Sequence, residues 1–100
     1  MNNIKAEFLF KSIDAQTMVA ELNADYNVDP KSHPDSMHSF MARDLLIVKL
    51  RNLFSYCTKK QIEGLVTSEE FAEDFKTEVN SMADECFLPI RISKAEINLN

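Results

Sequence analysis

The sequence predicts a mainly α fold, a bundle of about four helices; the alternative is an α+β fold with short strands at the two termini. Only one glycine, Gly64, occurs in 100 residues, so tight hairpin turns should be rare. Most segments are rich in good helix formers, with apolar residues three or four positions apart. Two stretches near the termini instead alternate apolar and polar residues. At this length we expect residues 1–100 to form a single globular domain around one core.

The N-terminal alternation favours a short strand over residues 4–11, with Ile4, Ala6, Phe8 and Phe10 on one side. A helix here would leave Ile4 and Phe8 facing water. The period then changes, because a helical stripe begins near Asp14 and runs through Ala15, Met18, Val19, Leu22 and Tyr26. We therefore predict a helix over residues 14–26, with Asp14 as its N-cap.

Residues 27–34 contain Pro30 and Pro34 and are predicted to be a loop, with Pro34 opening the next helix. Residues 37–57 are apolar almost all round a helical wheel, which predicts a central helix buried on several sides. Residues 58–61 match a capping box that begins a short helix ending near Val66. The methionines and phenylalanines, including Met37, Phe40 and Phe87, are assigned to the core.

A second capping box, over residues 67–70, begins the clearest helix of the chain, which extends to Cys86. Its apolar stripe is Phe71, Phe75, Val79, Met82 and Cys86. Helix signals stop at Pro89. Residues 88–92 and 97–99 form two short alternating runs, which we expect to pair with the N-terminal strand as a small sheet.

The net charge of −5 is unevenly distributed along the chain. Residues 67–86 carry seven carboxylates against one lysine, while residues 41–60 carry five cations against one carboxylate. The seven carboxylates lie opposite the apolar stripe of the helix: Glu69, Glu70, Glu73, Asp74, Glu78, Asp84 and Glu85. This face either keeps the protein soluble or docks a basic partner, such as a nucleic-acid-binding protein. Lys49 and its basic neighbours could also pair with it inside the chain.

Other chemistry has little support. Cys57 and Cys86 are expected to be two buried thiols, since no Cys-x-x-Cys pair indicates zinc or a disulfide framework. His33 and His38 are five residues apart, which is the wrong spacing for one helix face, so no metal site is predicted. No catalytic residue or cofactor is predicted either. A segment resembling a helix-turn-helix would place acidic residues against phosphates, which argues against nucleic-acid binding.

In size and charge the chain resembles small acidic proteins of phages and mobile elements, such as anti-CRISPR, antitoxin and toxin-immunity proteins. The resemblance implies a non-enzymatic inhibitor or regulator that docks on a macromolecular partner. The alternative is a helical oligomerisation module whose contact is Met37, Phe40 and Met41. A small enzyme ranks third, and a homo-oligomer stays open. With neither a secretory signal nor a membrane-spanning run, the expected location is the host cytoplasm.

Overall fold

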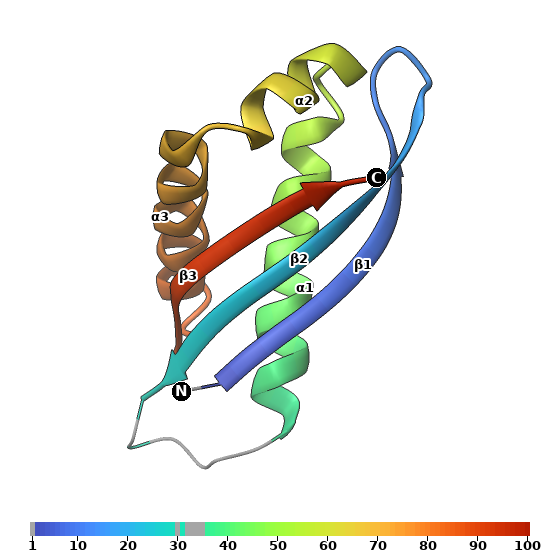
Figure 1. Cartoon of the computed structure of the whole chain (residues 1–100). Coiled ribbons are helices and arrows are strands. Elements are labelled where there is room, and N and C mark those ends of the chain that lie inside the picture. Colours follow the sequence, from blue (N-terminus) through green and yellow to red (C-terminus); the bar gives the residue numbers. More distant parts are fainter. Residues whose placement is uncertain (1, 30, 32–35) are drawn as a thin grey trace.

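The computed structural model describes residues 2–29, 31 and 36–100, and it is an α+β fold (Figure 1). Within these residues, three strands form one antiparallel sheet in the order β1-β2-β3, and three helices lie between β2 and β3 in the chain. The prediction of a mainly α bundle of about four helices is therefore wrong. The alternative with terminal strands was closer, but the sheet is larger than predicted and includes a strand where a helix was expected.

Strands β1 (Asn2–Lys11) and β2 (Thr17–Val28) form a long hairpin, so the predicted helix over residues 14–26 is wrong. Buried residues alternate along β2, with Met18, Ala20, Leu22, Ala24 and Tyr26 facing the core. Met18, Leu22 and Tyr26 fit a helical stripe as well as a strand, since a spacing of four residues is two strand periods and is close to one helical turn of 3.6 residues. Ala20 and Ala24 distinguish the strand from the helix. Both are fully buried, as an alternating strand requires, although neither lay on the predicted helical stripe.

The hairpin turn, residues 12–16, contains no glycine. Ala15 takes the left-handed conformation, with φ of 61°, and the Ser12 N–H donates to the Gln16 carbonyl at 3.0 Å. Asp14 lies in this turn and is not the N-cap of a helix over residues 14–26. Its carboxylate instead accepts from the N–H of Lys59 at 3.1 Å, so it caps a helix 45 residues away.

Helix α1 (Ser36–Phe54) is the predicted central helix, although it ends three residues early. Helix α2 (Lys59–Val66) has the predicted capping box, in which the Thr58 hydroxyl and the Gln61 side chain bond each other's backbone N–H. Helix α3 (Glu69–Glu85) begins one residue later than the predicted box, because its N-cap is Ser68. None of these helices, within the described ranges, is long and apolar enough to cross a membrane.

Strand β3 (Ile90–Leu99) is one continuous strand where two short runs were predicted, and it pairs with β2, not with β1. A bulge at Ser93 shifts the register opposite Asp25 and Tyr26. The Ser93 hydroxyl donates to the Asp25 carbonyl at 3.2 Å at this point. The bulge brings both halves of β3 into phase with β2, so Ile92 and Ala95 both face the core.

Helices α1 and α3 cover one face of the sheet (Figure 1), and a chain of phenylalanine rings links the two layers. Phe10 of β1 stacks on Phe54 of α1, with ring centroids 5.2 Å apart, and Phe54 stacks on Phe71 of α3 at 6.2 Å. Not all aromatic residues are in the core as predicted: Phe40 is 56% exposed and Phe87 is 93% exposed. The opposite face of the sheet is exposed and carries charged and amide side chains.

Candidate partner-binding surface

Helix α3 is held against the core by its apolar side. Phe75 and Val79 are fully buried there, as the stripe predicts, and so is Ala83 beside them. At the C-terminus the prediction fails, because Cys86 is the exposed C-cap and Cys57 is only half-buried in the loop after α1. Both thiols are free. The helix is therefore a rigid support whose opposite side faces solvent.

All seven predicted carboxylates are exposed, but α3 divides them into two rows. At 100° per residue, Glu69, Glu73 and Asp84 lie on the side towards β3, and we call them the inner row. Glu70, Asp74, Glu78 and Glu85 lie on the side away from β3, and we call them the outer row. The sequence predicted one acidic helix face, whereas the structure divides these carboxylates between two distinct surfaces.

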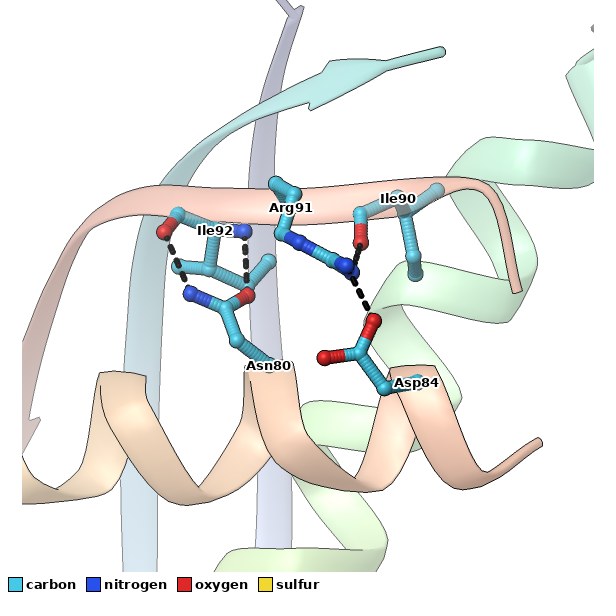
Figure 2. A network of polar contacts seen from close by, with 5 residues as sticks. All are labelled: Asn80, Asp84, Ile90, Arg91 and Ile92. Atoms are coloured by element: carbon cyan, nitrogen blue, oxygen red, sulfur yellow. Dashed lines mark hydrogen bonds and ion pairs between the residues drawn. The ribbon is translucent and has the colours of Figure 1, made fainter. Parts of the chain in front are cut away.

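The inner row is engaged within the chain. Asp84 pairs with Arg91 of β3, and Glu73 Oε2 lies 3.0 Å from Lys76 Nζ (Figure 2 shows the first pair). Glu69 and Glu73 line an open groove of about 360 Å³ between the first half of α3 and Lys94–Glu96 of β3. Cations on both walls of this groove offset its carboxylates. The inner row therefore contributes less net negative potential than its sequence suggests.

The outer row is largely uncompensated. Glu78 is its one member with an ion pair in the described part of the chain, with Oε2 3.3 Å from Nζ of Lys49 on α1. This pair confirms that part of the basic segment turns towards the acidic helix. Arg43 and Arg51 do not, since they lie over the rings of Phe40 and Phe8, respectively. The outer row thus keeps most of its charge facing solvent.

The spacing of the outer row is regular. Glu70, Asp74 and Glu78 follow one another at four-residue intervals, about 6 Å along the axis, and Glu85 extends the row to about 22 Å. Like charges at this spacing destabilise a helix by about 0.2–0.5 kcal/mol per pair. The row therefore carries a cost in helix stability that a mixed-charge face would avoid.

Two residues that the sequence did not single out attach α3 to the sheet (Figure 2). The side-chain amide of Asn80 accepts from the Ile92 N–H at 2.7 Å and donates to the Ile92 carbonyl at 3.0 Å. Arg91 donates to the Ile90 carbonyl at 2.9 Å as well as to Asp84. An amide on the sheet side of an otherwise acidic helix is the one signal that could have revealed the first contact.

Only one of the two histidines lies within the described residues. His38 is half-buried on α1, while His33 lies outside the described residues, as do Pro30 and Pro34 of the predicted loop. Across residues 2–29, 31 and 36–100, no three His, Cys, Asp or Glu side chains gather as metal ligands would. Hydrogen bonds from the Ser12 hydroxyl and the Lys59 backbone N–H lower the pKa of the Asp14 carboxyl below its usual range. Asp14 thus connects the β1–β2 turn to the first residue of α2.

No family model matches the sequence, and no curated protein matches it either.

Proposed function

We propose that this chain is a non-enzymatic binding protein that docks on a basic macromolecular partner through the outer row of α3. The partner class that fits is a nucleic-acid-binding protein, whose cationic groove is complementary to a row of carboxylates on a rigid helix. Occupying that groove would block or regulate the partner in stoichiometric fashion, as antitoxin, immunity and anti-CRISPR proteins do. The free thiols Cys57 and Cys86 fit a reducing compartment such as the cytoplasm.

The observation that carries this proposal is the uncompensated charge of the outer row. A face that served only solubility would gain from interspersed cations, because pairs at four-residue spacing stabilise a helix. Glu70, Asp74 and Glu85 instead extend the like-charge row, and Lys49 approaches only Glu78. Residues that cost stability and remain exposed are typical of binding surfaces.

Preorganisation supports the same function. Asn80 and the buried side of α3 fix the helix on the sheet, so its carboxylates need no ordering when a partner arrives. Charge on a fixed scaffold accelerates encounter with a basic surface, and this acceleration falls steeply with added salt. Binding should therefore be fast and strongly salt-dependent.

The test compares two variants with equal changes in charge. Glu70→Gln/Asp74→Asn neutralises the centre of the outer row, while Glu63→Gln/Glu96→Gln removes two exposed charges elsewhere. The partner is captured from host lysate at low salt, identified, purified and titrated with each variant. We expect the outer-row variant to bind at least about 10-fold more weakly, with unchanged or slightly higher thermal stability, and the second variant to bind nearly as the wild type. Equal binding by the two variants would refute the proposal.

A second candidate function is an oligomerisation module, as the exposed side of α1 suggests. Met37 is 60% exposed and Phe40 56% exposed, whereas Met41 is half-buried. Large apolar side chains at this exposure favour a contact surface on this side of the molecule.

A further inference from the structure

The two edges of the sheet differ in how many side chains bind their backbone groups. At the β3 edge, Asn80 binds both backbone groups of Ile92, and Arg91 binds the Ile90 carbonyl. These contacts occupy positions where another strand would otherwise pair. At the β1 edge, the described contact is a single long hydrogen bond of 3.4 Å from Arg51 to the Leu9 carbonyl.

Hydrogen bonding in β2 shows which groups of β1 are open. The Val19 carbonyl accepts from the Asn100 N–H at 2.9 Å, so Val19 faces β3, and Met18 and Ala20 face β1. Because Ala20 lies opposite Phe8 in the register, the even-numbered residues of β1 bond to β2. The backbone groups of Asn3, Lys5, Glu7 and Leu9 therefore point out of the sheet, and we call this set the open edge.

The side of α1 next to the open edge is partly apolar. Phe54 stacks on Phe10, and Arg51 lies over the ring of Phe8, so this side of α1 follows β1. On a helical wheel Phe40 and Ile47 lie between Phe54 and Arg51. Phe40 is 56% exposed and Ile47 is half-buried. The open edge and this side of α1 thus form one continuous surface about 20 Å long.

We propose that a second copy of this chain occupies this surface, pairing β1 with β1 in antiparallel fashion about a two-fold axis at Ala6. The product is a continuous six-stranded sheet with the exposed sides of the two α1 helices brought together beneath the joined strands. The proposal does not depend on the function of the outer row. It leaves α3 at the far edges of the dimer, where two outer rows would face solvent.

Charge complementarity selects the occupant and the register. With the axis at Ala6, Lys5 of each copy lies opposite Glu7 of the other, and Asn3 lies opposite Leu9. An axis at Lys5 would place Lys5 against itself, and an axis at Glu7 would place Glu7 against itself. An axis at Phe8 would place Lys5 against Lys11. A register centred on Leu9 would also make two opposite-charge pairs, between Glu7 and Lys11, but it overlaps β1 only over residues 7–11. The register centred on Ala6 makes two opposite-charge pairs and overlaps residues 2–10, so the open edge is self-complementary in the longer of the two registers.

The experiment measures self-association of the full chain by sedimentation velocity from micromolar to millimolar concentration. Lys5→Glu and Glu7→Lys each turn both attractive pairs into repulsive ones, so each should raise the dimer Kd about 30-fold, equivalent to about 2 kcal/mol. An equimolar mixture of the two variants should restore association, since each carboxylate then opposes an ammonium group. The double variant Lys5→Glu/Glu7→Lys should dimerise with itself as the wild type does, because its exchanged charges again form two opposite-charge pairs. Lys60→Glu, an exposed change on α2, is the matched control and should associate as the wild type does.

Amide hydrogen exchange identifies the surface used. Exchange at Lys5 and Glu7 should slow as the dimer forms, while the amides of Phe8 and Phe10 should be protected at all concentrations. A wild type that stays monomeric at millimolar concentration would overturn the proposal. The proposal would also fail if both single variants associated as tightly as the wild type, or if mixing them did not restore association. It would fail as well if the amides of Lys5 and Glu7 exchanged equally fast in the monomer and in the associated protein. A monomer whose open edge binds an extended peptide would show that the edge receives another protein, and the second-copy proposal would fail.

Discussion

Asn80→Ala is the sharpest test of how the sheet is closed at β3. The substitution removes both hydrogen bonds between the Asn80 amide and the Ile92 backbone and leaves two partly buried backbone groups without a partner. Each such loss costs about 1–1.5 kcal/mol where water can partly replace the partner. Alanine regains about 0.5 kcal/mol through its higher helix propensity. The expected net loss in the free energy of unfolding is therefore about 2 kcal/mol.

Urea unfolding followed by circular dichroism measures this loss, with an unchanged m value as the sign that the unfolded state is the same. At about 2 kcal/mol, the midpoint of thermal unfolding should fall by roughly 10 °C for a chain of this size. Ser81→Ala, at an exposed position on the same helix, is the control and should change stability by less than about 0.5 kcal/mol. If Asn80→Ala and Ser81→Ala have the same stability, the Asn80 amide does not hold β3.

Two further predictions concern the turns. Phe87 ends α3 in the left-handed conformation, with φ of 56°, and is 93% exposed, so Phe87→Gly should stabilise the protein by about 0.5–1 kcal/mol in urea unfolding because it relieves strain without loss of packing. The Asp14 pKa lies below its ordinary value of 3.8, so Asp14 stabilises the fold fully above that pH and loses this contribution as the pH falls through the native pKa. The stability difference between wild type and Asp14→Asn should therefore be constant near neutral pH and shrink below about pH 4.

Each of these predictions has its own control. Phe87→Ala keeps the left-handed backbone and removes the same exposed ring, so it should gain nothing; a gain equal to that of Phe87→Gly would show that the backbone carries no strain. For Asp14, stability curves of wild type and Asp14→Asn should be compared at matched ionic strength. A difference that does not vary with pH would contradict the role assigned to the ionised carboxylate.

The second strand shows most clearly where the sequence misleads. Met18, Leu22 and Tyr26 fit both patterns, and the scarcity of glycine in the chain argued against a hairpin, whose turn Ala15 instead makes by adopting a positive φ. Asp14 was predicted to be the N-cap of a helix over residues 14–26, which is wrong, and nothing in the sequence indicated that its carboxylate accepts from the N–H of Lys59, 45 residues away. Local patterns carry no information about which distant segment supplies a partner.

The sequence alone indicated α1, α2, α3 and β1, alternating segments within what is β3, and the exposure of the seven carboxylates, because these depend on local periodicity and capping. Only the tertiary structure decided that residues 17–28 are the central strand, where burial on one face requires a period of two. It also divided the acidic face into two rows, because β3 and Lys76 engage one side of α3 and leave the other in solvent. The open edge of β1 likewise exists only once three strands are ordered, since an edge is a property of the sheet and of no single strand.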